Sequence, residues 1–389
     1  MTLSFKTSMV GPSRVGKTTL ITAILAETET MLAGSGIALV MNEATEMRIR
    51  KNRKDLRRAV EAREFDAGSL GGNQSMFRYE VELRAAGDTE TDPGIPFSIL
   101  DYPGGWLDPA VRMSSAEAQR DWPACEEHIT ESLMLLLPVE AAVLMEAVTP
   151  AQRRAVADLL GFEDVEAMAR KWARARNLPE HRDEPAVVVI APLKCEKYFD
   201  DNGGTGRDAV RLRTLVEAKY QSVIDIIREE TTDRAVRVVY APIDTYGCVD
   251  LMEGEWIERQ DEYGSPTLDF RGHYRFREIP PVVRPKAAGS VMRELCQCVV
   301  SGRRTAEQRR AAEAQGSYQA ALERRTEQKG FWGALDYYLN GEALANRAAR
   351  LRSRRTLAEA RERQEELNTM LSRLAGQPVD DRVDEWKTS

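Results

Sequence analysis

The residues best suited to do chemistry in this sequence form one run, Gly11 to Thr18, which reads Gly-Pro-Ser-Arg-Val-Gly-Lys-Thr. Its pattern is G-x-x-x-x-G-K-[ST], in which glycines let the backbone turn successive N–H groups towards the oxygens of a phosphate. The helix expected to begin near Lys17 would point its positive end at the same anion. The run therefore predicts a cradle for the phosphates of a nucleotide.

Two side chains of this run have predicted roles of their own. Lys17 is expected to place its ammonium on the β- and γ-phosphates, and the hydroxyl of Thr18 is a candidate Mg²⁺ ligand. The residues predicted to bind the nucleotide here are Gly11, Ser13, Val15, Gly16, Lys17, Thr18 and Thr19.

A second candidate site is Asp101-Tyr102-Pro103-Gly104, which follows an apolar stretch from Pro96 to Leu100. An aspartate at the end of such a strand can hold Mg²⁺ through water. The D-x-x-G spacing places the N–H of Gly104 within reach of a γ-phosphate, so this loop would sense that phosphate. We predict Asp101 as a metal ligand and both Asp101 and Gly104 as catalytic residues. The alternative is a strand followed by an ordinary Pro-Gly turn.

A hydroxyl that would complete the metal site has no clear counterpart. Ser69, Ser75 and Thr89 all lie between the two motifs, and Ser69 or Ser75 fits best because each precedes an alternating strand-like stretch at 77–83. We take Ser75 as the candidate ligand.

The residue after Gly104 is Gly105, where many GTPases carry a glutamine that orients the attacking water. Either Arg14 or another side chain assists catalysis, or turnover is slow.

The third motif concerns the base. Leu193-Lys194-Cys195-Glu196 follows the aliphatic run 186–191, where GTPases place [NT]-K-x-D. Lys194 would pack on the guanine face, and the carboxylate of Glu196 would accept hydrogen bonds from the ring N–H groups. A second base-flanking loop is expected at 241–245. The alternative for Lys194 and Glu196 is a surface ion pair.

Alternating strand-like and helix-like stretches must position these motifs. The continuous aliphatic runs 186–191 and 236–241 are typical of buried parallel strands, and a helical stretch at 207–230 separates them. We therefore expect an α/β fold of the P-loop NTPase kind, with three layers and a mainly parallel sheet. Residues 1–300 would form this domain, with a hairpin or lid-like insertion at 250–285.

Residues 301–389 are rich in Ala, Arg, Glu and Gln and predict a helical extension, with a coiled coil as one option. We expect this extension to bind a protein partner or a second copy of the chain. Its acidic residues are interspersed with the basic ones, which favours a solvated face. The net charge of -7 also argues against nucleic acid or a membrane surface as the main partner.

Bulk composition agrees with a globular protein of the cytoplasm. Apolar residues make up 42% and charged residues 30% of the chain. The 5 cysteines are scattered and follow no secretory signal, so we expect a reducing compartment. No apolar run reaches the ~20 residues that a membrane span needs.

Three runs together resemble the YcjX-like family of bacterial P-loop GTPases, within the translation-factor-related class. They are 11–18, Asp101-Tyr102-Pro103-Gly104-Gly105-Trp106-Leu107, and Ala191-Pro192-Leu193-Lys194-Cys195-Glu196. The resemblance covers roughly residues 1–300 and implies binding of GTP or GDP with Mg²⁺. The chain departs from the GTPase pattern at Leu193 and Glu196, which bears on base specificity.

The leading hypothesis is a Mg²⁺-dependent GTPase switch that hydrolyses GTP slowly and signals to a protein partner. A nucleotide-bound scaffold that does not turn over remains an alternative, as does an ATPase with altered base specificity. A small-molecule kinase shares the same phosphate loop but would need an acceptor pocket, for which 250–285 is the only candidate stretch.

Overall fold

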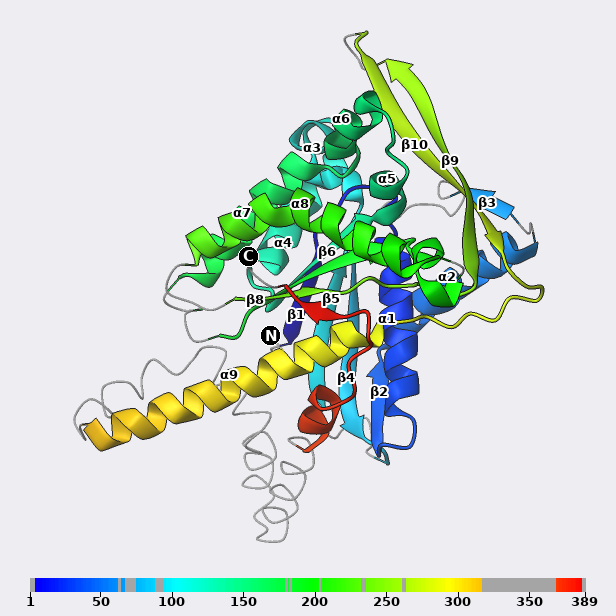
Figure 1. Cartoon of the computed structure of the whole chain (residues 1–389). Helices are drawn as coiled ribbons and strands as arrows, with labels where there is room; N and C mark the ends of the chain where they lie inside the picture. Colours follow the sequence, from blue (N-terminus) through cyan, green and yellow to red (C-terminus); the bar gives the residue numbers. More distant parts are fainter. Residues whose placement is uncertain are drawn as a thin grey trace.

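The computed structural model describes residues 4–61, 64–66, 75–87, 94–178, 181, 184–202, 204–231, 236–260, 264–316 and 369–386. Within these residues a central sheet carries helices on both faces, and a long hairpin projects from one corner (Figure 1). None of the helices described is both long and apolar enough to cross a membrane.

The central sheet has eight strands, and its middle five run parallel. β4 is antiparallel to β5, β2 is antiparallel to β4, and β11 is antiparallel to β8. From one edge to the other the strands are β11 (Asp384–Glu385), β8 (Arg237–Tyr240), β7 (Val187–Leu193), β6 (Met134–Glu140), β1 (Phe5–Met9), β5 (Ile95–Asp101), β4 (Phe77–Ala85) and β2 (Ile37–Met41). The predicted α/β fold with a mostly parallel sheet is confirmed.

Helices cover both faces of this sheet (Figure 1). α4, α5, α7 and α8 pack in one hydrophobic core, whereas α1, α9 and residues 370–383 pack in the other. The helices are α1 (Lys17–Leu32), α2 (Glu43–Glu61), α3 (Pro109–Ser114), α4 (Ala116–Thr130), α5 (Ala141–Met145), α6 (Pro150–Leu159), α7 (Phe162–Arg176), α8 (Gly206–Glu230) and α9 (Gly289–Gly316).

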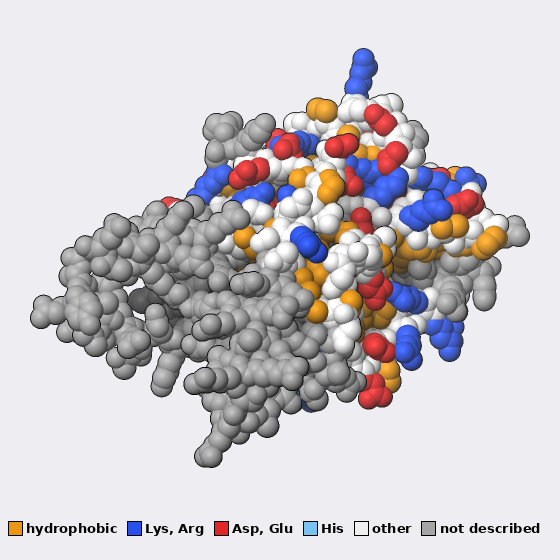
Figure 2. Space-filling view, turned by 90° about the horizontal axis from the view of Figure 1, so that it is seen from below, with side chains coloured by type: hydrophobic (Ala, Val, Ile, Leu, Met, Phe, Trp, Pro, Cys, Tyr) orange, Lys and Arg blue, Asp and Glu red, His pale blue; other side chains and the backbone are white. Residues whose placement is uncertain are grey.

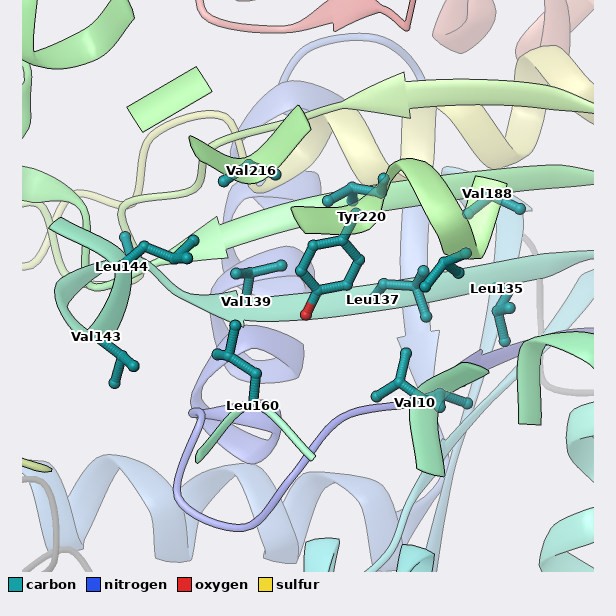
Figure 3. Packing of buried hydrophobic residues seen from close by; sticks show 14 of the residues in the cluster. Val10, Leu135, Leu137, Val139, Val143, Leu144, Leu160, Val188, Val216 and Tyr220 are labelled. Carbon is teal, nitrogen blue, oxygen red and sulfur yellow. The ribbon is translucent and has the colours of Figure 1, made fainter. Parts of the chain in front are cut away.

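β6 and β7 are almost entirely hydrophobic because both of their faces are covered. In β7, Val188 and Ile190 face one core while Val187 and Val189 face the other, as the alternation of side chains in a strand requires. Figure 3 shows the first core, where Tyr220 of α8 lies over β6. Each fully buried aliphatic side chain of this kind contributes about 1.5–3 kcal/mol to stability.

A smaller sheet is built around the hairpin of β9 (Val249–Gln260) and β10 (Pro266–Phe276), with β3 (Glu64–Asp66) along one edge. This hairpin occupies the stretch in which a hairpin or lid-like insertion was expected. Trp256 and Phe270 pack edge to face across it at a centroid distance of 5.2 Å. The indole Nε1 of Trp256 donates to the backbone oxygen of Glu146, which joins the hairpin to the main body.

Neither edge strand of the central sheet was predicted. β2 is short and only half buried at the edge of the sheet, so it lacks the aliphatic run that marks the central strands. β11 lies in a region expected to be helical, and it forms because Val383 and Trp386 are buried on either side of it. Residues 369–375, just before it, are helical.

Candidate functional site

The loop from Gly11 to Thr18 joins β1 to α1 and lies where the parallel strands end. Gly16 has φ 108° and Arg14 has φ 64°, so the backbone turns sharply before α1 begins at Lys17. A side chain on Gly11 would place its Cβ 2.9 Å from Cγ of Pro138, so only glycine fits against β6 there. The N-terminus of a sixteen-residue helix thus faces this loop.

Lys17 carries a buried positive charge at the centre of the loop. Its side chain is only 7% exposed, and its Nζ donates 2.8 Å hydrogen bonds to the backbone oxygens of Gly11 and Pro12. Burial lowers the pKa of Lys17 to about 8, and the charge of Asp101 opposes this shift. An anion placed here would restore the favourable environment of the ammonium.

Thr18 and Asp101 meet directly beside this lysine. The Thr18 hydroxyl donates a 2.7 Å hydrogen bond to Oδ2 of Asp101, at the end of β5. Asp101 is fully buried, and its Oδ1 has no hydrogen-bond partner of ordinary geometry in the described part of the chain. Burial raises the pKa of this carboxyl, against the Thr18 hydrogen bond and the charges of Lys17 and Arg48.

A hydroxyl and a carboxylate with a spare oxygen are the donors that a hard divalent cation prefers. The described residues hold no group of three or more His, Cys, Asp or Glu side chains that could enclose a metal by themselves. A cation at Thr18 and Asp101 would therefore need further oxygens from a ligand or from water, as is usual for Mg²⁺.

Gly104 lies against the 11–18 loop. A Cβ added to it would meet the backbone nitrogen of Ser13 at 2.3 Å and Nζ of Lys17 at 2.5 Å. Because such distances are impossible for a real Cβ, any residue other than glycine would push the two loops apart. Gly104 begins the short helix η1 (Gly104–Leu107), so the predicted D-x-x-G loop does contact the predicted phosphate cradle.

Arg112 holds η1 from the other side. Its Nη1 donates to the backbone oxygens of Trp106 and Leu107 at 2.5 and 2.6 Å. Its guanidinium stacks over the ring of Trp122 at 4.4 Å. Trp106 and Trp122 are both buried in the core.

Ser75 is exposed and makes no hydrogen bond to another described residue. It does lie at the correct edge of the sheet, since Phe77, two residues later, pairs in register with Asp101. Its role as a metal ligand stays a prediction. Ser69 and Thr89 lie outside the described residues.

Lys194 links the end of β7 to the 11–18 loop. With φ 56° it turns its side chain so that Nζ donates to the backbone oxygen of Arg14 at 2.9 Å and to Oε1 of Glu140 at 2.6 Å. Leu193, which replaces the usual Asn or Thr, is buried in the core beside Gly16. The lysine stem thus spans the distance between the two predicted motifs.

Glu196 is 4% exposed, and its carboxylate accepts a hydrogen bond from its own backbone N–H but pairs with no other side chain within the described residues. Burial, followed by the charge of Asp244, raises its pKa to about 8. Tyr246 lies near it and hydrogen-bonds to Thr19 of α1, and burial raises the pKa of this phenol to about 12. Three segments distant in sequence therefore meet at Thr19, Glu196 and Tyr246.

Three residues near these motifs were not predicted from the sequence. Arg48 lies in the charged helix α2, yet its guanidinium sits 5.5 Å from the ring of Phe77 and its charge acts on Asp101. Tyr246 follows directly after the predicted 241–245 loop, a placement that offered a weak signal. The sequence offered no signal for Arg382, because it lies in the C-terminal segment, far from the three motifs.

No protein-family model matches this chain, and no curated protein matches it. The resemblance to the YcjX-like GTPases therefore stays a prediction.

Proposed function

We propose that this protein binds a guanine nucleotide with Mg²⁺ and hydrolyses GTP slowly, acting as a switch. The observation that carries the proposal is the Thr18–Asp101 hydrogen bond beside the buried Lys17. A buried ammonium, a hydroxyl and a carboxylate at the start of a helix provide the donors that a Mg²⁺-bound triphosphate needs.

In this proposal the Lys17 ammonium and the N–H groups of the 11–18 loop bind the phosphates. Thr18 and Asp101 would hold Mg²⁺, and the ion would supply positive charge to neutralise the β- and γ-phosphates. Gly104, in contact with Ser13 and Lys17, would shift when a γ-phosphate enters, which moves η1. A protein partner, or a second copy of the chain through the C-terminal helices, would read this movement.

Guanine is proposed because the carboxylate of Glu196 is buried without a side-chain partner beside the Lys194 stem. The ring N–H of guanine and its exocyclic amino group would satisfy this carboxylate and lower its raised pKa, because they hydrogen-bond to the charged form. Slow turnover is proposed because Gly105 stands where a water-orienting glutamine would be. Arg14 is exposed beside the loop and is the candidate to assist.

A reducing compartment, the cytoplasm, is part of the same proposal. Four of the cysteines are buried thiols: Cys125, Cys195, Cys248 and Cys296. Such thiols suit a cell interior that keeps cysteines reduced.

The direct test is equilibrium binding of fluorescent GTP, GDP and ATP with and without Mg²⁺, followed by a phosphate-release assay. We expect GTP and GDP to bind more tightly than ATP, with Mg²⁺ strengthening GTP binding. ATP binding equal to or better than GTP binding would support the ATPase instead. Tight GTP binding with no phosphate release, alone or with a partner, would support the nucleotide-bound scaffold.

A further inference from the structure

The C-terminal segment, residues 369–386, is built into the domain that carries the candidate site. β11 adds to the sheet beside β8, and the N–H of Trp386 donates to the backbone oxygen of Val238 at 2.9 Å. Trp386 is buried in one core and Val383 in the other. The loop after β8, at 241–245, leaves the sheet directly beside this segment.

Arg382 connects the segment to that loop. Its Nη1 donates a 3.0 Å hydrogen bond to Oδ2 of Asp244, and its guanidinium stacks on the ring of Phe199 at 4.2 Å. It also pairs with Asp201. The side chain is only 11% exposed, and a planar guanidinium that is both stacked and paired in this way has a single orientation.

Asp244 connects Arg382 to the residues on the base side of the candidate site. Its carboxylate is fully buried and also accepts from Nδ2 of Asn202 at 2.8 Å. Its Oδ1 lies 3.7 Å from Sγ of Cys195 and is one of three acceptors within reach of that thiol. Cys195 stands between Lys194 and Glu196, so one carboxylate joins the C-terminal segment to the residues proposed to read the base.

The charges make Arg382 hard to replace. Without it, the buried Asp244 would keep the hydrogen bond from Asn202, the nearby thiol of Cys195 and the charge of Lys286, which is itself paired with Asp201. A buried carboxylate that loses its ion-pair partner is strongly destabilised. The same carboxylate faces Glu196, whose charge it opposes. Loss of Arg382 would therefore shift the 194–196 segment as well as Asp244.

We propose that Arg382 is a positioning residue for the base side of the nucleotide site, so that nucleotide binding and the docking of the C-terminal segment depend on each other. This inference rests on the proposed function. Coupling of this kind is reciprocal: whatever displaces Arg382 from Asp244 weakens nucleotide binding, and bound nucleotide holds Arg382 in place. A partner that engages the extension would then control nucleotide affinity.

The test compares Arg382→Gln with Arg213→Gln in the full-length chain. Arg213 holds the same segment through a 2.6 Å bond from its Nη1 to Oδ2 of Asp384, but it contacts neither Asp244 nor Asp201. Affinities are measured for GDP, and for inorganic tripolyphosphate as a competitor that reaches only the phosphate loop. We expect Arg382→Gln to weaken GDP by about tenfold and tripolyphosphate by less than about twofold, with Arg213→Gln close to wild type for both.

Equal loss of GDP and tripolyphosphate affinity in Arg382→Gln would overturn the inference, because a structural defect acts on the whole site. GDP affinity at the wild-type level would overturn it too. If Arg382→Gln fails to fold, Asp244→Asn combined with it removes the unpaired charge, and the same selective loss of GDP is expected. A wild-type protein that binds tripolyphosphate but neither GDP nor GTP would instead contradict the proposed function itself.

Discussion

The hydroxyl of Thr18 donates a 2.7 Å hydrogen bond to Oδ2 of Asp101, although the two residues lie 83 positions apart in the chain. The contact forms because β1 and β5 are parallel neighbours, so the loop after one strand meets the end of the other. Hydrophobic cores cover both faces of the sheet that carries these strands. On the face of the molecule shown in Figure 2, the described acidic and basic side chains lie interspersed. The Thr18–Asp101 pair is therefore the natural starting point for mutation.

Thr18→Ala should weaken Mg²⁺-dependent GTP binding by about tenfold or more, since it would remove a proposed metal ligand. It also removes the hydrogen bond to Asp101, which contributes about 1.5–3 kcal/mol to stability. The matched control is Thr22→Ala, one turn along α1, whose hydroxyl bonds to the backbone oxygen of Thr18. Titration with GTP at several Mg²⁺ concentrations checks both variants. Equal Mg²⁺ dependence in Thr18→Ala and wild type would contradict the assigned role.

Nucleotide affinity should fall as the pH rises above about 8, because burial lowers the pKa of Lys17 to about 8 and the phosphates need the ammonium form. Bound phosphate raises this pKa, so the fall in affinity is gradual. The stability of the unliganded protein should change with pH in the opposite direction. Between pH 8 and 10.5 the unfolded chain holds the proton more strongly, so this group adds stability as the pH rises through that window.

Lys17→Arg is the control for this pH profile, since arginine stays charged throughout. Its affinity for GDP should be lower overall but should depend on pH only through the ligand's own titration. The two profiles, measured by calorimetry from about pH 7 to about pH 9.5, must differ in slope. Parallel profiles would show that Lys17 does not govern the pH dependence.

Gly104→Ala should displace η1 and reduce stability by about 1–3 kcal/mol, because its Cβ would lie 2.3 Å from the nitrogen of Ser13. Gly105→Ala is the matched control, since its nearest neighbours are 3.5 Å away and it should cost less than about 0.5 kcal/mol. Thermal unfolding measures both variants. The selectivity of Gly104→Ala for GTP over GDP should also shrink, and unchanged stability with unchanged selectivity would refute the close contact.

Glu196→Gln should reduce the preference for GDP over ADP by about tenfold, because an amide can accept from only one of the two guanine donors, the ring N–H and the amino group, and turns its own donor towards the other. Asp200→Asn is a neighbouring control on the exposed surface and should leave the preference unchanged. Competition binding with GDP and ADP measures the ratio. A ratio that is the same in Glu196→Gln and wild type would remove Glu196 from the base site.

Stability should fall in mild acid because of His128, which is buried and hydrogen-bonded to Ser8 and Ser98. Burial lowers its pKa from 6.5 to about 3, so the unfolded chain binds the proton better between these values. Stability is then lost as the pH falls below 6.5, by about 1.4 kcal/mol per pH unit.

His128→Gln should reduce the slope of the free energy of unfolding against pH by the contribution of one proton, whatever it does to absolute stability. His273→Gln, at a half-exposed position on β10, is the control and should keep the wild-type slope. Denaturant unfolding at several pH values between about 4 and 7 gives the slopes. Identical slopes in all three proteins would mean that another group is responsible.

Much of the fold was predictable because its signals are local. The aliphatic runs that correspond to β7 and β8 predicted buried strands. The spacing of two glycines, a lysine and a threonine predicted the loop at 11–18. β2 and β11 were missed because edge strands bury too few side chains to leave a pattern.

The amino-acid sequence by itself determined many of the central elements and the G-x-x-x-x-G-K-[ST] motif, since hydrophobic periodicity and glycine spacing act within a few residues. Only the tertiary structure decided which motifs meet: Thr18 with Asp101, Lys194 with Arg14, and Arg382 with Asp244. The order of strands in the sheet sets these partners, and that order results from packing over the whole domain. A buried arginine near the end of the chain carries no local mark of the aspartate that it will hold.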